Sequence, residues 1–173
     1  VFITDGTKFQ EMNETYRTFF TKDPPARATV VAPLMGAANV VEITLTASSL
    51  PKQIFTTPAA DGTPGKPSPI LSSAVKVGNR LYLSGLLGNT PANKGDTEAQ
   101  TVEILARVGR TLKVAGFDWP DLADGVVYIT DTNNFAAMNK GYTSVVKALP
   151  ARATVKSGLV ADGMLEIMFV ASK

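Results

Sequence analysis

The chain contains one hexapeptide twice, as Pro25-Ala26-Arg27-Ala28-Thr29-Val30 and again as Pro150-Ala151-Arg152-Ala153-Thr154-Val155. The repetition extends outward from this segment. Val1-Phe2-Ile3-Thr4-Asp5 matches Val127-Tyr128-Ile129-Thr130-Asp131, which lies 126 residues later. That spacing is the size of a small domain and far exceeds the period of a solenoid repeat. The sequence therefore predicts a tandem protein.

Further matched positions define how far the two copies extend. They are Phe9, Met12, Asn13 and Tyr16 against Phe135, Met138, Asn139 and Tyr142, and Val41-Glu42-Ile43 against Leu165-Glu166-Ile167. Only the second copy is preceded by a long segment, residues 52–125. We therefore expect residues 51–173 to form one complete domain, and residues 1–50 to be the C-terminal part of a similar one. We expect another polypeptide or a further N-terminal piece to complete the first unit, the alternative being a processing artefact at its start.

Composition narrows the chemistry. The 173 residues are 45% hydrophobic, enough for a sizeable core, and no apolar run approaches the ~18 residues of a membrane span. The net charge of +2 comes from scattered lysines and arginines, so nucleic-acid binding is not expected. With no histidine and no cysteine, the chain has no disulfide, no Cys or His zinc site and no Ser-His-Asp triad. The compartment stays undetermined.

Hydrophobic periodicity and turn signals predict the elements. A Gly78-Asn79 pair between two β-prone runs indicates a tight hairpin. Asp96 is a candidate N-cap, Gly116 a candidate stop, and Val102, Leu105 and Leu112 are expected on one face of the helix between them. The expected strands are 53–57, 74–77, 80–84, 125–129, 153–157 and 165–171, with helices 96–115 and from Asn133 or Asn134 to Leu149. The first copy adds strand 1–4, helix 9–20, strand 27–32 and strand 40–47. This order suits one sheet with helices on one face, an α+β layer pair.

Arg27 and Arg152 each follow Pro-Ala and open a strand, which makes them candidates for holding a carboxylate in a two-pronged hydrogen-bonded pair. Pairing with a neighbouring acid at the sheet edge is the alternative. Glu42 and Glu166 lie inside apolar strands, where a carboxylate is costly unless it is paired or functional. Each could act as a general base if burial raises its pKa, whereas a structural ion pair between Glu166 and Arg152 is the alternative.

Three further kinds of residue could border a cleft. Asn13 and Asn139 follow core-facing methionines on the predicted helices, and could cap a backbone group or reach a ligand. Thr29 and Thr154 share a strand face with their arginines. Gly85, at a strand end, could let a ligand approach the backbone, or could simply shape a turn.

Together these motifs resemble the RidA/YjgF family of imine and enamine deaminases. The resemblance covers residues 53–171 as one whole domain and residues 1–47 as the latter part of another. It is carried by Leu83-Ser84-Gly85, by Phe135-x-x-Met138-Asn139-x-x-Tyr142, by Pro150–Val155, and by Leu165-Glu166-Ile167 with Phe169-Val170-Ala171.

The resemblance implies a chorismate-mutase-like α+β fold, a single sheet with two helices on one face, in trimers or pseudo-trimers with clefts between subunits. It implies hydrolysis of 2-aminoacrylate-type imino acids to 2-keto acids and ammonia, without metal or organic cofactor. Arg152 and Arg27 match the arginine that binds the substrate carboxylate, and Glu166 and Glu42 match the glutamate that activates water. Gly85, Asn139, Asn13, Thr154 and Thr29 match positions at the substrate.

The chain departs from the family at two positions. Thr154 and Thr29 stand where many members carry a cysteine, and Ser68-Pro69-Ile70-Leu71 lacks the tyrosine of their Gly-Pro-Tyr segment. A non-catalytic module that binds small carboxylates or acts as a chaperone is therefore the alternative to a deaminase. A ribonuclease-like activity is a third hypothesis, which the weak basic signal and the absent histidines disfavour.

Overall fold

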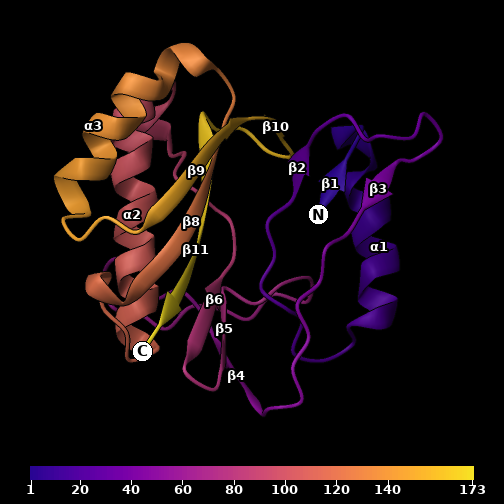
Figure 1. The fold of residues 1–173 in the computed structure, drawn as a ribbon, viewed down its shortest axis with the longest axis horizontal. Coiled ribbons are helices and arrows are strands. Elements are labelled where there is room, and N and C mark those ends of the chain that lie inside the picture. The colour runs from indigo at the N-terminus through magenta and orange to yellow at the C-terminus, as the bar shows by residue number, and fades with distance from the viewer.

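The computed structural model describes residues 1–173 and contains a seven-stranded sheet with two helices on one face (Figure 1). The strand order is β4-β5-β6-β11-β8-β9, with β7 also paired to β11. The strands are β4 (Lys52–Phe55), β5 (Ala74–Val77), β6 (Arg80–Leu83), β7 (Leu86–Leu87), β8 (Leu122–Ile129), β9 (Ala151–Lys156) and β11 (Leu165–Ser172). The helices are α2 (Thr97–Val114) and α3 (Phe135–Val145). This α+β layering confirms the predicted fold class.

The main core lies between these helices and the sheet. Its fully buried members include Ile104, Leu105, Val108 and Leu112 of α2, Met138 and Tyr142 of α3, and Leu165, Ile167 and Phe169 of β11. The Asp96 carboxylate accepts a hydrogen bond from the Ala99 N–H and so caps α2, as predicted. Gly116 follows α2 with a φ of 77°, a conformation that favours glycine and ends the helix. None of the helices combines the length and the apolar character that a membrane crossing requires.

Three details of the helix prediction were wrong. Helix α3 ends at Val145, before Pro150, and Leu149 is exposed, because the chain turns extended at Val146. Asn134 takes the N-cap position, but its side chain makes no capping hydrogen bond. Asp131 instead accepts a hydrogen bond from the Asn133 N–H in a short 3-10 turn. Val102 is partly exposed because the buried face of α2 passes through its neighbours Thr101 and Ile104.

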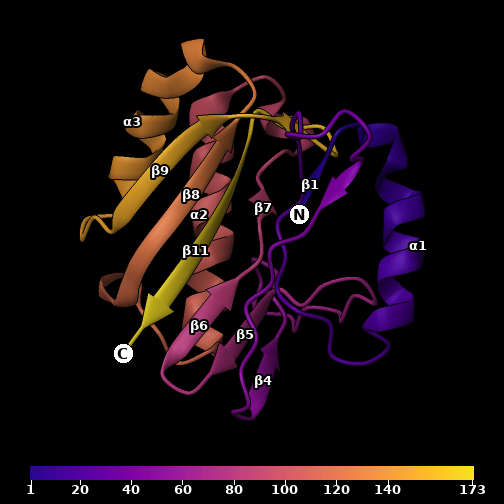
Figure 2. The same cartoon turned by 45° about the vertical axis from the view of Figure 1, so that its right-hand side comes forward.

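The N-terminal copy, residues 1–50, forms most of a second, four-stranded sheet of order β10-β2-β1-β3. Its strands are β1 (Phe2–Ile3), β2 (Val30–Val31) and β3 (Val41–Glu42), shorter than predicted, and β10 (Gly158–Leu159) comes from the other copy. Helix α1 (Phe9–Phe19) lies on this sheet, on the side of the molecule away from α2 and α3 (Figures 1 and 2). The two copies are thus joined through β10.

A small apolar cluster lies at the contact between the two copies. Ala28 and Val30 pack against Tyr128, with Met168 at the edge. Side chains alternate along β11, so Leu165 and Ile167 face the helices while Glu166 faces the N-terminal copy. The N-terminal copy therefore covers part of the sheet face that the helices leave free, around Tyr128 and Glu166, whereas Val155 of β9 stays exposed on that face.

Candidate functional site

Arg27 is almost completely buried, with 6% of its surface exposed, and α1 supplies its partners. One guanidinium nitrogen donates a hydrogen bond to the Asn13 side-chain oxygen at 2.6 Å, and another lies 3.9 Å from the Met12 sulfur. The guanidinium carbon lies 4.6 Å from the centre of the Tyr16 ring, in cation–π range. The Nε of Arg27 is buried without a hydrogen-bond partner. This arginine is held rigidly and keeps one donor free.

The backbone of Arg27 is held by the C-terminal copy. Its N–H donates to the Ser84 hydroxyl oxygen at 2.8 Å, and its carbonyl accepts from the Gly85 N–H at 3.2 Å. Ser84 in turn donates to the Ser72 carbonyl at 2.6 Å. Gly85 was expected to contact the substrate through its backbone. In this structure its N–H instead donates to the carbonyl oxygen of Arg27, which belongs to the other copy.

Glu166 lies on the same side of β11 as these residues and is 4% exposed. A side chain at Gly85 would overlap its carboxylate and would come within 2.9 Å of the Ala28 Cβ, so glycine is what allows this close approach. Burial raises the pKa of Glu166 from an ordinary 4.5 to about 7. The Thr29 backbone hydrogen bond and the charge of Arg27 lower that pKa, but less than burial raises it.

The Arg27 guanidinium influences the Glu166 carboxylate without forming an ion pair with it. The Thr29 hydroxyl, two residues after Arg27 and just before β2, is also buried without a partner. The arrangement therefore offers a cation, a hydroxyl and a carboxylate that titrates near neutral pH. We call it the composite cluster. Its members are Asn13, Arg27 and Thr29 from the N-terminal copy and Ser84, Gly85 and Glu166 from the C-terminal copy.

Arg152 repeats the local geometry of Arg27 in the C-terminal copy. It donates to the Asn139 side-chain oxygen at 2.6 Å, lies 3.8 Å from the Met138 sulfur, and stands 4.5 Å from the centre of the Tyr142 ring. The Thr154 hydroxyl is likewise buried without a partner. We call Asn139, Arg152 and Thr154 the open cluster, because Arg152 is more exposed than Arg27.

No glutamate accompanies the open cluster. Arg152 points toward α3, on the helix side of the sheet, whereas Glu166 points to the opposite side, so the Arg152–Glu166 ion pair considered as an alternative does not form. Glu42, the counterpart of Glu166, is exposed on β3 and makes no ion pair. In the structure Arg27 thus lies near Glu166, whereas Arg152 has no glutamate beside it and Glu42 makes no ion pair.

Two residues of the site were missed at the sequence level. Ser84 positions the Arg27 backbone, and only its place beside Gly85 in Leu83-Ser84-Gly85 hinted at this. Tyr128 is paired across the sheet with Glu166, and both burial and the Glu166 charge raise its pKa. Alternation along its strand could have placed Tyr128 on that face. No group of three or more carboxylates is arranged to hold a metal ion.

The chain thus combines an α+β sheet with a buried arginine and a buried glutamate that come from two copies of one repeated segment. The sequence model of the endoribonuclease L-PSP family matches residues 66–173. The chain is similar to a 2-iminobutanoate/2-iminopropanoate deaminase of Capra hircus, with 32% identity over 130 residues, 72% of this chain and 92% of that protein.

Other comparisons agree with this match. A RutC family protein of Sulfurisphaera tokodaii is 39% identical over 114 residues, 62% of this chain and 91% of that protein. The crystal structure of a YjgF family member from Neisseria meningitidis superposes with a TM-score of 0.60 at 28% identity, over 73% of this chain and 98% of that one. The chain belongs to the endoribonuclease L-PSP family, which includes the RidA/YjgF proteins.

Proposed function

We propose that the protein hydrolyses reactive 2-imino or 2-enamino acids to 2-keto acids and ammonia, and that the composite cluster is its active site. The observation that carries the proposal is the contact at Gly85. Its N–H donates to the Arg27 carbonyl, a side chain there would overlap the Glu166 carboxylate, and Arg27 and Glu166 form no ion pair. The similarity to a deaminase of imino acids supports the same reaction class.

The cluster has the groups that this hydrolysis needs. The free Nε of Arg27 and the Thr29 hydroxyl would bind and orient the substrate carboxylate. Glu166, with a pKa of about 7, would take a proton from water as the oxygen attacks C2 of the imine. Returning that proton to the nitrogen gives a carbinolamine. Glu166 would then move the remaining hydroxyl proton to the nitrogen, so that ammonia leaves as the C2 carbonyl forms. Because Arg27 and Glu166 are both buried, residues that cover them have to move for the substrate to enter.

The test is keto-acid release from 2-iminobutanoate that an amino-acid oxidase generates in the assay, measured above the spontaneous rate. We expect Arg27→Ala and Glu166→Gln each to reduce the acceleration by about 10²-fold or more, the usual scale for loss of a general base or an orienting charge. Arg17→Ala, an exposed arginine on α1, is the matched control.

Arg152→Ala distinguishes the two arginine clusters. If Arg152→Ala abolishes turnover and Arg27→Ala does not, the open cluster carries the activity and the assignment to the composite cluster is wrong. Tight keto-acid binding without any acceleration by the folded protein would instead support the carboxylate-binding module.

A further inference from the structure

Tyr128 of β8 brings a hydroxyl group to the carboxylate of the composite cluster. It pairs directly across the sheet with Glu166 of β11, and residues paired in this way place their side chains on the same face, with Cβ atoms about 5 Å apart. The N-terminal copy contacts that face, and Tyr128 packs there in one apolar cluster with Ala28 and Val30. Tyr128 is only 9% exposed, so its neighbours hold the ring in place.

Gly85 shows how close this tyrosine lies to the reacting groups. A Cβ at Gly85 would overlap the Glu166 carboxylate and would lie 2.9 Å from the Ala28 Cβ, so both groups border one small space. Ala28 belongs to the same apolar cluster as Tyr128 and directly follows Arg27 in the sequence. Tyr128 therefore borders the composite cluster between its arginine and its glutamate.

The Tyr128 hydroxyl and the Glu166 carboxylate influence each other without bonding. Burial raises the pKa of the Tyr128 hydroxyl, and the charge of Glu166 raises it further, but no hydrogen bond joins the two groups. A phenol with a raised pKa keeps its proton at neutral pH, so it serves as a hydrogen-bonding group rather than as an acid or a base. Two polar groups that are near each other and not bonded are well placed to share a water molecule.

The internal repeat shows that packing alone does not require the hydroxyl. Phe2 is the counterpart of Tyr128, and it pairs with Glu42 as Tyr128 pairs with Glu166. Phenylalanine supplies the same ring to the same cluster, since Phe2 also packs against it. The hydroxyl is present only beside the glutamate that lies near Arg27.

We propose that Tyr128 is a catalytic residue of the composite cluster, whose hydroxyl oxygen holds the attacking water by accepting one of its hydrogens. This inference rests on the proposed hydrolysis. Glu166 takes the other hydrogen of that water as a proton while the water oxygen forms its bond to C2 of the imine. Tyr128 keeps its own proton throughout, so the proton balance of the hydrolysis is unchanged. Its hydrogen bond directs the lone pair of the water toward C2.

The test compares Tyr128→Phe with the wild-type chain in the release of keto acid from 2-iminobutanoate. The substitution keeps the ring and removes only the hydroxyl, so the melting temperature should not change. We expect kcat to fall about three- to tenfold, the scale of one lost hydrogen bond, while KM stays the same because Arg27 and Thr29 hold the substrate carboxylate. Binding of 2-oxobutanoate, measured by isothermal titration calorimetry, should also stay the same.

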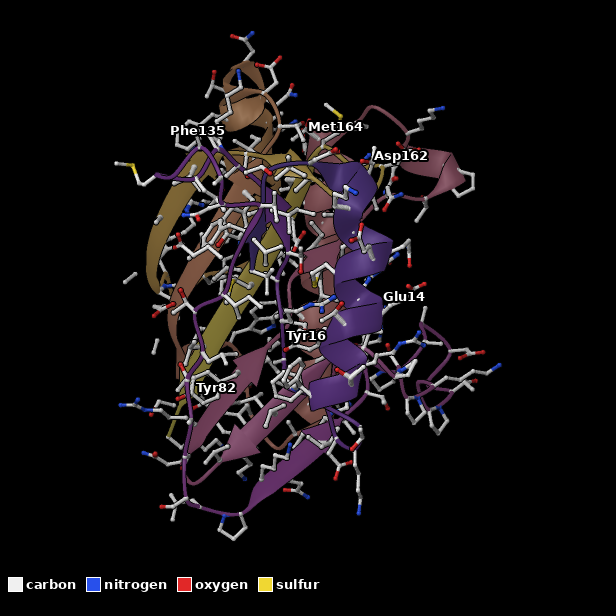
Figure 3. All side chains as sticks on the ribbon, turned by 90° about the vertical axis from the view of Figure 1, so that its right-hand side faces the viewer. Glu14, Tyr16, Tyr82, Phe135, Asp162 and Met164 are labelled. Carbon is white, nitrogen blue, oxygen red and sulfur yellow. The ribbon has the colours of Figure 1, made fainter.

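Tyr82→Phe is the matched control. Tyr82 lies on β6 opposite Val170 of β11, on the sheet face away from the helices, as Glu166 does. Figure 3 shows Tyr82 toward the lower end of the sheet and Met164, which directly precedes β11, toward its upper end. Tyr82 therefore shares the face of Glu166 without bordering the composite cluster, and its variant should keep the wild-type kcat.

The outcomes separate this inference from the activity on which it rests. If the wild-type chain gives no acceleration, the proposed function fails and the role of Tyr128 fails with it. If the wild type is active and Tyr128→Phe keeps its kcat, the inference alone is overturned. It is also overturned if kcat falls together with 2-oxobutanoate binding or the melting temperature, because Tyr128 would then act through packing, or if Tyr82→Phe loses as much activity.

Discussion

Glu166 is expected to make the stability of the fold fall as pH rises, and Glu166→Gln should remove that dependence. In the unfolded chain the carboxyl loses its proton near its ordinary pKa of 4.5, whereas in the folded protein it keeps the proton up to a pKa of about 7. Between those values the folded state binds the extra proton, so raising the pH favours unfolding. Below 4.5 both states are protonated and above 7 both are ionised, so the change is confined to that window.

The size of the effect follows from the rise in pKa. A change from 4.5 to about 7 corresponds to about 3 kcal/mol of unfolding free energy. Because other groups titrate in the same range, the quantity to measure is a difference. The unfolding free energy of the wild type minus that of Glu166→Gln should fall by about 3 kcal/mol from pH 4 to pH 8. Glutamine keeps the shape of the side chain and cannot ionise.

Urea unfolding followed by circular dichroism at several pH values gives both curves. Glu14→Gln, which changes an exposed glutamate on α1, serves as the control for the substitution itself. A difference that stays constant with pH would show that Glu166 titrates normally. A difference that rises with pH would show that attraction to Arg27 outweighs burial, and either result refutes the reasoning from burial.

Three further outcomes follow from the same contacts. The kcat/KM for imine hydrolysis should rise with pH to a plateau above about 7, because Glu166 acts as a base only when ionised; a profile that is flat from pH 5 to 9 would exclude this role. Gly85→Ala should abolish turnover and destabilise the fold by about 1–3 kcal/mol, since its methyl group would overlap the Glu166 carboxylate; thermal unfolding with unchanged stability would contradict the packing described. Gly141→Ala should also lower the free energy of unfolding by about 1–3 kcal/mol, because its methyl group would clash with the Glu98 carbonyl. Thr15→Ala, at the matching position of α1, should change that free energy little. Equal effects of the two substitutions in urea unfolding would show that both helices are covered alike.

The elements that follow local rules could be predicted from the sequence. The helix that Asp96 caps and the hairpin turn at Gly78, with its φ of 58°, depend on neighbours within a few residues. The end of α3 could not be placed, because the apolar spacing continues to Leu149 although the chain turns extended at Val146. In that stretch periodicity describes which residues are apolar, and tertiary packing decides how many of them stay helical.

The site was predictable in its residue types and not in its pairing. An ion pair between Arg152 and Glu166 was one alternative from the residues, and the family resemblance implied that both belong to one site. Strand alternation, however, sends their side chains to opposite faces of the sheet. The residue that approaches Glu166 is Arg27, 139 residues away (166 minus 27), and only the contact between copies creates that proximity.

The two arginine clusters separate what the local sequence determines from what the contact between copies adds. Arg27 and Arg152 have the same asparagine, methionine and tyrosine partners at nearly the same distances, so the motif alone positions the guanidinium. Only Arg27 is then covered by Ser84, Gly85 and Glu166. An arginine without the carboxylate can bind an anionic substrate but has no group to take the proton from water. If the proposed hydrolysis occurs, replacing Arg27 should therefore reduce turnover. Replacing Arg152 should chiefly reduce the amount of keto acid bound. Comparing the two variants shows what Glu166, on the other side of the contact, contributes to turnover.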